Sequence, residues 1–408
     1  MRLVNKLLAG CAAIALIVTC SASAMADPPG GVTPRDGDVV GVGSDTTGYL
    51  LDQLAYDYDK THAKSAPLLY SWDPTDPVTG KAGGRIITKA ACKPIARPDG
   101  SAAGVAALRA NTTDPSDRSD HCIDYAGSSS LPSAGGPPCA SGGICFIQLA
   151  GDAVTWASRD AASGGSDAPA SLTMTQLKDI YLCKITDWAK VGGRHAAIKA
   201  FLPRTSSGTR MSWLTALGGG TPIKPGACVS DEGNTLQDNQ GISPELDSPE
   251  VIVPYSVADY IAQAYHDARC ARASCSGSPA CHPAGTQNRF GCDRSGVLGI
   301  NKIGGSKPVL PWPLPKSACE QCAINPKFSP PFLRTVFIVV RDAATSDHIP
   351  GYLEPFFAAR TAKIPGWVCS SSKALADIRN YGFLPFGGSA ALSGSPTATP
   401  QCGTPYHS

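Results

Sequence analysis

The sequence has 408 residues, and its 35 Lys and Arg residues nearly balance 33 Asp and Glu residues, which gives a formal net charge of +2 at pH 7. This balance excludes a global electrostatic field for nucleic acid or for an anionic membrane, so attraction for a charged ligand must come from local groups. The length exceeds what one hydrophobic core usually serves, and we therefore expect two lobes.

Residues 1–26 have the features of a secretory signal peptide. Arg2 and Lys6 precede an apolar run over residues 7–18, and small residues end at Ala24 and Ala26, where cleavage is expected. The run is too short for a membrane-spanning helix. We expect the mature chain to be secreted, either extracellular or at the cell envelope.

The cysteine content agrees with export to an oxidising compartment. Two of the 16 cysteines, Cys11 and Cys20, lie in the leader, and neither has a good context for lipid attachment, so free secretion is favoured over a lipid anchor. The 14 that remain are an even number, for which disulfides are the expected state, and the sequence leaves their pairing open. They are Cys92, Cys122, Cys139, Cys145, Cys183, Cys228, Cys270, Cys275, Cys281, Cys292, Cys319, Cys322, Cys369 and Cys402.

Strand and helix patterns alternate along the chain, which predicts a mixed α/β sheet. Residues 38–42 predict a strand that runs into the small polar turn 43–47, and residues 49–58 then repeat apolar side chains at helical spacing. Further strands are expected over residues 68–72, 85–89, 144–150, 154–158, 198–202 and 333–340, and further helices over residues 100–108, 171–182, 211–217, 256–267 and 370–381.

The order of these elements predicts a discontinuous first lobe, formed by residues 27–151 and 332–408, and a second lobe formed by residues 152–331. The apolar strand expected at residues 333–340 is the return crossing to the first lobe. Residues 270–330 are rich in Cys, Gly and Pro and show little periodicity, which fits a disulfide-rich insertion in the second lobe.

Residues 204–210, Arg-Thr-Ser-Ser-Gly-Thr-Arg, have the composition of an anion-binding loop. A chain that enters a helix through Ser207, Gly208 and Thr209 presents unpaired backbone N–H groups, two hydroxyls and the positive end of the helix dipole to one point. Arg204 and Arg210 add guanidinium groups that suit a tetrahedral oxyanion. An ordinary capped helix start has the same pattern, so this loop alone leaves both interpretations open.

Two blocks before this loop favour the anion site. They are Leu-Thr-x-x-Gln-Leu-x-x-Ile-Tyr at residues 172–181 and Ile-Thr-Asp-Trp at residues 185–188. Followed by a strand and Ser-Gly-Thr, they form an ordered series that resembles the phosphate-binding proteins of ABC transporters, which are type II periplasmic-binding proteins. The resemblance covers about residues 39–386 and implies two α/β lobes with mixed sheets that close on a hinge.

The resemblance also implies which residues of the first lobe face the ligand. Ser44, Asp45 and Thr46 match a loop of the form Gly-x-Gly-Ser/Ala-Thr, although Asp45 stands where Thr is usual and places a carboxylate near the site. Ser101 matches the serine of a second helix start. Asp124 matches a buried Asp that accepts a proton from the bound anion, which would admit hydrogen phosphate and reject sulfate.

The family pattern Arg-x-x-Gly-Ser-Gly-Thr is represented by residues 204–209, one residue shorter. The resemblance therefore implies ligand contacts from Ser207, Gly208 and Thr209, with Arg204 or its substitute Arg210 supplying the charge. The implied function is a monomeric solute-binding protein that captures inorganic phosphate and hands it to an ABC-transporter permease. No cofactor, metal, nucleic-acid partner or catalysis is expected.

Other functions remain open at this stage. A secreted adhesion or signalling protein could keep the fold for another oxyanion or for no ligand, and Asp45 and the short arginine spacing favour this modestly. A phosphohydrolase is less favoured, because the Ser-Ser-Ser-Lys sequence at residues 370–373 has no companion motif and is better explained as a helix cap. Cys319, Cys322 and His282 have zinc-ligand character, but a disulfide role is favoured.

Overall fold

The computed structural model describes residues 27–28, 32–76, 80–111, 122–131, 139, 143–263, 294–311, 322–343, 346, 348–386 and 401–406. The expected signal peptide and most of the expected Cys-rich insertion lie outside the described residues and stay predictions. The same holds for Cys270, Cys275, Cys281, Cys292 and Cys319.

One mixed sheet organises the molecule and confirms the predicted α/β fold class. Its strand order is β2-β1-β5-β15-β6-β10-β8-β9, with β11 and β16 also paired to β6. Parallel pairs, such as β1 with β5, stand at its two ends, and antiparallel pairs lie at its centre. The strands are β1 (Val39–Gly43), β2 (Leu69–Ser71), β5 (Tyr125–Ser128), β6 (Ile144–Arg159), β8 (Lys199–Phe201), β9 (Val229–Ser230), β10 (Val251–Ser256), β11 (Leu298–Ile300), β15 (Leu333–Arg341) and β16 (Leu384–Pro385).

The helices pack around this sheet, and the described residues also form short two-stranded ribbons that are not part of it. The α-helices are α1 (Asp45–Thr61), α2 (Ser101–Ala110), α3 (Met174–Tyr181), α4 (Gly208–Leu217), α5 (Val257–Ile261), α7 (Glu354–Phe357), α8 (Trp367–Ser370) and α9 (Ser372–Asn380). The ribbons are β3 (Arg85–Ile86) with β4 (Ile95–Ala96), β7 (Ser171–Leu172) with β12 (Lys302–Ile303), and β13 (Val309–Leu310) with β14 (Ala323–Ile324). Among the described residues, no helix combines the length and the apolar character that a membrane crossing requires.

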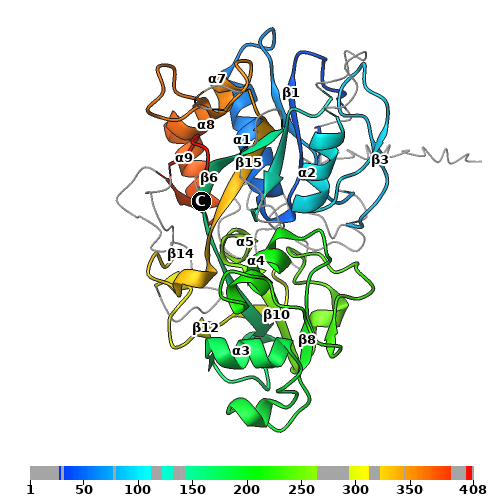
Figure 1. Cartoon of the computed structure of the whole chain (residues 1–408), viewed down its shortest axis with the longest axis vertical. Helices are drawn as coiled ribbons and strands as arrows, with labels where there is room; N and C mark the ends of the chain where they lie inside the picture. Colours follow the sequence, from blue (N-terminus) through cyan, green and yellow to red (C-terminus); the bar gives the residue numbers. More distant parts are fainter. Residues whose placement is uncertain are drawn as a thin grey trace, which may run out of the picture.

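The molecule has two halves, which β6 and β15 connect (Figure 1). The upper half carries α1, α2 and α7 to α9, and the lower half carries α3, α4, β8 and β10. The sequence predicted two strands over 144–158, but β6 is continuous, because β15 pairs with its first part and β10 and β11 with its last part. The expected lobe boundaries at 151 and 332 stay predictions; one lies inside β6 and the other directly before β15.

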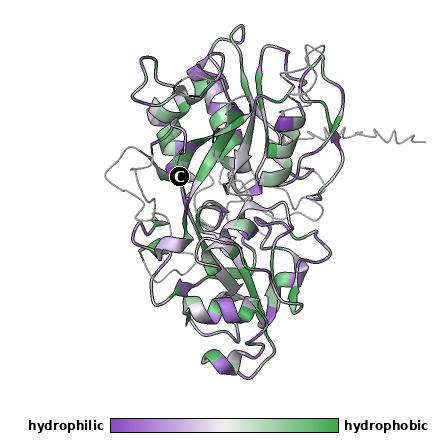
Figure 2. Ribbon diagram, in the orientation of Figure 1, coloured by the Kyte–Doolittle hydropathy of each residue, from purple (hydrophilic) through white to green (hydrophobic). Residues whose placement is uncertain are grey.

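The apolar residues of the central strands form the core that joins the halves. One continuous cluster of buried residues extends from α1 across β6 and β10 to α4, and a smaller cluster lies between α2 and the neighbouring strands. Figure 2 shows these central strands as predominantly hydrophobic. Trp156, Trp188 and Trp213 are completely buried in the lower half.

Disulfides tie loops to this framework, as the cysteine count predicted. The pairs are Cys92–Cys122, Cys139–Cys145, Cys183–Cys228 and Cys369–Cys402. Cys322 is disulfide-bonded as well, which agrees with the disulfide role favoured over zinc for this residue.

The Ser-Ser-Ser-Lys sequence is a helix start, as predicted. Ser371 is the N-cap residue of α9, and its side chain accepts a hydrogen bond from the backbone N–H of Lys373. The Lys373 ammonium pairs with Asp57 at 2.7 Å and Asp377 at 2.5 Å. The cap therefore belongs to Ser371 rather than Ser370, and the lysine has structural partners.

Candidate functional site

Three helices from both halves begin at one place between the halves. The helices α1 and α2 of the upper half begin after Ser44 and Gly100, and α4 of the lower half begins after Ser207. The backbone N–H of Ala102 donates to the carbonyl of Ser206 at 3.1 Å, so the α2 and α4 starts are in direct contact. The first-turn N–H groups of a helix have no partner within the helix, and each start carries about half a positive charge. Their convergence makes this place attractive to an anion.

Four buried hydroxyls fill the space between these helix starts, and we call them the hydroxyl cluster: Thr46, Ser101, Ser129 and Thr209. Thr46 Oγ1 donates to Ser129 Oγ at 3.1 Å and lies 3.2 Å from Thr209 Oγ1. Ser101 Oγ lies 3.3 Å from Ser129 Oγ and accepts from the Ser129 backbone N–H. Hydroxyls that bond to one another can rotate to donate to a bound anion instead. The structure thus brings together three of the predicted ligand residues and adds Ser129.

Gly208 allows the two halves to approach this closely. A Cβ atom at residue 208 would lie 2.2 Å from Ser129 Oγ and 2.6 Å from Ser101 Oγ. Such distances are far below van der Waals contact, so only glycine fits when the halves are together. The ligand contact that the resemblance implies for Gly208 stays a prediction.

Arg334 places its guanidinium against the hydroxyl cluster, a contact that the sequence did not predict. Its Nη2 donates to Thr209 Oγ1 at 3.1 Å, and its Nη1 donates to the Ser129 carbonyl at 3.1 Å. The completely buried Asp152 on β6 holds the guanidinium through contacts of 2.9 Å to Nε and 2.7 Å to Nη2. The sequence gives one signal that could have identified Arg334, namely that an arginine stands at the beginning of the most apolar strand.

Ser44 and Ser207 occupy the two helix starts differently. Ser44 Oγ is buried, and it has no hydrogen-bond partner in the part of the chain that the structure describes. Ser207 Oγ accepts from the Arg210 backbone N–H at 3.0 Å and donates its proton to Asp238 Oδ2 at 2.6 Å. Ser44 is therefore a free donor beside the cluster, whereas the Ser207 proton already has an acceptor.

Arg204 is buried but neutralised by carboxylates. It contacts Asp45 at 3.1 Å and also pairs with Asp99 and the side-chain oxygen of Gln237. Asp45, the departure from the family loop, thus lies beside the predicted arginine. This pairing leaves Arg204 less positive charge to offer a ligand than the sequence implied.

The segment 237–240 is a second feature that sequence analysis missed. Its residues Gln237, Asp238, Asn239 and Gln240 are all buried. Asn239 Nδ2 donates to the Asp45 carbonyl at 3.0 Å, and Asp238 accepts from Ser207. A polar run of this kind predicts an exposed loop, and only the contact between the halves buries it.

The structure does not bring Arg210 to the cluster. Its Nη1 donates to the Pro203 carbonyl at 2.8 Å and to Asp231 Oδ2 at 2.7 Å. Residues one place apart on a helix do not face each other, so Thr209 points into the cluster while Arg210 points away. The expectation that Arg210 substitutes for Arg204 at the ligand is corrected accordingly.

The structure also separates Asp124 from the cluster. Asp124 is completely buried and contacts Lys89 Nζ at 2.8 Å, the Val40 backbone N–H at 2.7 Å and the Tyr352 hydroxyl at 3.2 Å. It precedes β5, whereas Ser129 follows this strand, which separates the two by about 15 Å at 3.3 Å per residue. Burial raises the pKa of Asp124, and Lys89 opposes this shift. Asp124 is therefore part of a structural ion pair at the opposite end of the strand.

Several buried ionisable groups surround the helix starts. Burial raises the pKa of Asp45 to about 7, with Arg204 opposing the shift and Asp238 adding to it. Burial also raises the pKa of Asp259 well above its usual range, with Asp238 as a further cause. It lowers the pKa of the Arg294 guanidinium to about 9. The net charge of the side chains around the helix starts therefore changes near neutral pH, where Asp45 titrates.

Replacing Asp45 by asparagine is expected to reduce the pH dependence of stability. The folded protein keeps this carboxyl protonated up to about pH 7, whereas the unfolded chain loses the proton near pH 3.9. The resulting stabilisation is complete below that lower value and is lost as the pH rises through 7. Between pH 5.5 and 8, the free energy of unfolding should fall by about 2 kcal/mol less in Asp45→Asn than in wild type.

Urea unfolding at several pH values measures this difference. The control is Asp187→Asn, because the backbone N–H of Ala189 lowers the pKa of Asp187 and moves its titration below this range. Equal slopes for Asp45→Asn and wild type would show that Asp45 does not titrate near neutrality.

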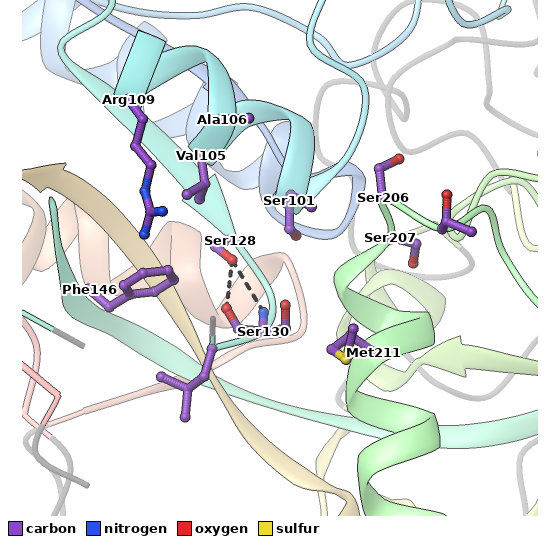
Figure 3. Close-up of a pocket in the computed structure, with 13 residues that line it drawn as sticks. Ser101, Val105, Ala106, Arg109, Ser128, Ser130, Phe146, Ser206, Ser207 and Met211 are labelled. Carbon is purple, nitrogen blue, oxygen red and sulfur yellow. Dashed lines mark hydrogen bonds between the residues drawn. The ribbon is translucent and has the colours of Figure 1, made fainter. Parts of the chain in front are cut away.

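A cavity of about 400 Å³ adjoins the hydroxyl cluster (Figure 3). Ser101, a member of the cluster, and Ser207 line the cavity, and α2 and α4 form its opposite walls. A possible metal-binding group, Cys139, Cys145 and His348, lies elsewhere, and its two sulfur atoms are joined in a disulfide.

Comparisons with known proteins agree with this architecture. The model of a family described as PBP superfamily domain matches residues 29–274. No curated protein matches the chain in sequence.

Several solved structures are similar over most of their length. An ABC-type phosphate transport receptor from Vibrio cholerae has 15% identity and a TM-score of 0.45, with 85% of this chain and 99% of that chain covered. PstS from Borrelia burgdorferi has 15% identity and a TM-score of 0.40, with coverage of 86% and 99%. A phosphate-binding protein from Stenotrophomonas maltophilia has 14% identity and a TM-score of 0.43, with coverage of 85% and 90%.

Proposed function

Since this chain belongs to the PBP superfamily, we propose that it is a secreted solute receptor that captures inorganic phosphate between two lobes. It releases this ligand to the permease of an ABC transporter. We take the lobes as residues 27–151 with 332–408, and residues 152–331. The strands β6 and β15 connect them and act as the hinge.

The observation that carries this proposal is the hydroxyl cluster with Arg334 at the meeting point of three helix starts. A tetrahedral oxyanion accepts hydrogen bonds from several directions, and donors from both halves surround this point. Binding would then couple the halves, since Thr46 and Ser101 belong to the upper half and Thr209 to the lower half. The ordered sequence blocks at 172–188 and 207–209 support the same ligand.

The energetics are adequate for a receptor. Hydrogen bonds to a charged group contribute about 1.5–3 kcal/mol each, and a micromolar dissociation constant requires roughly 8 kcal/mol. The cluster hydroxyls, Arg334 and the helix N–H groups supply more than the required number of donors. The surplus offsets the free energy of association and of closing the halves.

Titration of phosphate into the phosphate-stripped protein tests the proposal. We expect micromolar or tighter binding, and Thr46→Val should weaken it by about 10-fold or more because one donor to a charged ligand is lost. Thr61→Val is the matched control, since Thr61 lies at the other end of α1 and donates to the carbonyls of Asp57 and Tyr58. Its affinity should equal that of wild type.

A second candidate, a receptor of the same fold for another oxyanion, has one observation in its favour. Carboxylates already occupy two of the predicted phosphate donors, since Asp45 and Asp99 both pair with Arg204, and Asp238 accepts the Ser207 proton. Sulfate and arsenate are therefore titrated in parallel. If millimolar phosphate released no heat and left the melting temperature unchanged, the phosphate proposal would fail, and binding of another oxyanion would establish the second candidate.

A further inference from the structure

The cavity beside the hydroxyl cluster is larger than inorganic phosphate requires. Its volume is about 400 Å³, within the range of roughly 300–1,000 Å³ that is typical of pockets for organic ligands. Phosphate has only five non-hydrogen atoms, far fewer than a cavity of this volume can hold. The cavity thus offers space that the proposed ligand leaves unused.

Apolar atoms form the larger part of the exposed lining of the cavity, although Ser101, Arg109, Ser128, Ser130, Thr205, Ser206 and Ser207 line it as well. Its apolar side chains come from α2, the end of β5, β6 and α4, and they are Ala102, Val105, Ala106, Leu131, Phe146 and Met211. The Ser128 hydroxyl in the wall donates to the Ser130 carbonyl at 2.7 Å, so this donor is already used (Figure 3). Such walls favour an organic group over an ion or water.

The two spaces are continuous at the helix starts. Ser101 Oγ lies 3.3 Å from Ser129 Oγ in the cluster and also lines the cavity. Ser207, which precedes Gly208 at the start of α4, also lines the cavity. An anionic group in the cluster can therefore carry a substituent directly into the cavity. At the other end, Figure 3 shows Arg109 of α2 extending toward the Phe146 ring.

We infer that the receptor binds phosphate monoesters, with the phosphoryl group at the hydroxyl cluster and a small aromatic or aliphatic group in the cavity. The inference rests on the proposed phosphate site and names a wider ligand class for it. No bond is formed or broken, because binding requires only that the ester substituent leave the phosphoryl group toward the cavity.

Titration of the phosphate-stripped protein with inorganic phosphate, methyl phosphate and phenyl phosphate tests this inference. We expect phenyl phosphate to bind at least tenfold more tightly than methyl phosphate, since only its ring buries apolar surface in the cavity. Ala106→Phe should remove this preference by filling the cavity, and it should leave the affinity for inorganic phosphate within twofold of wild type. Ala106 is exposed on α2, so the larger side chain is compatible with the fold.

Ala110→Phe is the matched control, because it adds the same ring to the same helix outside the cavity lining. It should leave all three affinities unchanged. If Ala106→Phe fails to fold, Val105→Phe fills the same cavity from the neighbouring residue and replaces it.

The outcomes separate this inference from the function on which it rests. Equal binding of phenyl and methyl phosphate by a protein that binds inorganic phosphate overturns the ester inference and leaves the phosphate proposal intact. A phenyl preference that persists in both filling variants also overturns it. Absence of binding for all three ligands overturns the inference together with the phosphate proposal.

Discussion

Replacing Arg334 by alanine is expected to abolish measurable phosphate binding and to lower the free energy of unfolding by about 3–5 kcal/mol. The guanidinium contacts Thr209 and Ser129 in the hydroxyl cluster, so its loss removes the guanidinium N–H groups that the anion would meet there. It also leaves the Asp152 carboxylate completely buried without its ion-pair partner. An uncompensated buried charge is the main reason for the large loss of stability.

A second substitution separates the two effects of this variant. Asp152→Asn added to Arg334→Ala removes the unpaired charge. It keeps an oxygen for the Ala258 N–H, and its amide group can donate to the Ser256 hydroxyl, since these two groups bond to separate oxygens of Asp152 in wild type. The double variant should regain much of the lost stability in urea unfolding. It should not regain phosphate binding in calorimetry.

Arg210→Ala is the matched arginine control. Arg210 pairs with Asp231 away from the cluster, and partly exposed ion pairs contribute at most about 1 kcal/mol. Its phosphate affinity should lie within twofold of wild type, in contrast to what the sequence alone implied. Retained binding in Arg334→Ala, together with loss in Arg210→Ala, would reverse our assignment of the two arginines.

Replacing Gly208 by alanine is expected to reduce phosphate affinity by at least 100-fold while preserving the fold. The added Cβ would lie 2.2 Å from Ser129 Oγ and 2.6 Å from Ser101 Oγ, so the halves could not come together as they do in wild type. Alanine is a better helix former than glycine, so α4 itself should not be weakened. Closure rather than folding is therefore the step that the variant blocks.

Small-angle X-ray scattering with calorimetry measures this effect. Phosphate should reduce the radius of gyration of wild type and leave that of Gly208→Ala unchanged. Ser129→Gly removes the nearer of the two obstructing hydroxyls and should partly rescue the affinity of Gly208→Ala. Gly37→Ala is the control, because its Cβ would have no atom within 4 Å. Wild-type affinity in Gly208→Ala would mean that the ligand does not need the close contact seen between the halves.

Much of the fold could be predicted because it follows from local patterns. The alternation of apolar runs and helical spacing predicted β1, α1, α4 and β15 close to their observed bounds. The capping box of α3, formed by Thr173 and Gln176, is a local feature of the same kind. Each of these features depends on residues within a few positions of one another, so the sequence contains the whole signal.

The residues of the proposed ligand site divide in the same way, into those that local patterns predict and those that only the tertiary structure brings together. The helix starts at Ser44, Ser101 and Ser207 were recognisable, because small hydroxyl residues before a helix leave backbone N–H groups unpaired whatever the rest of the chain does. By contrast, Arg334 reaches the cluster only because β15 lies between β5 and β6 in the sheet. Its partner Ser129 is 205 residues away, and no local pattern specifies that contact.

Asp124 and Ser129 show what the sequence determined about this protein and what the tertiary structure decided. The resemblance of the sequence to a known family pointed to the Asp124 carboxylate, and Ser129, five residues further on, was not singled out. The direction of β5 in the sheet then decided which residue faces the site, since the two lie at opposite ends of the strand. Local spacing fixes where a helix or strand begins and ends, whereas the partner of a charged side chain depends on strand order and on how the halves meet.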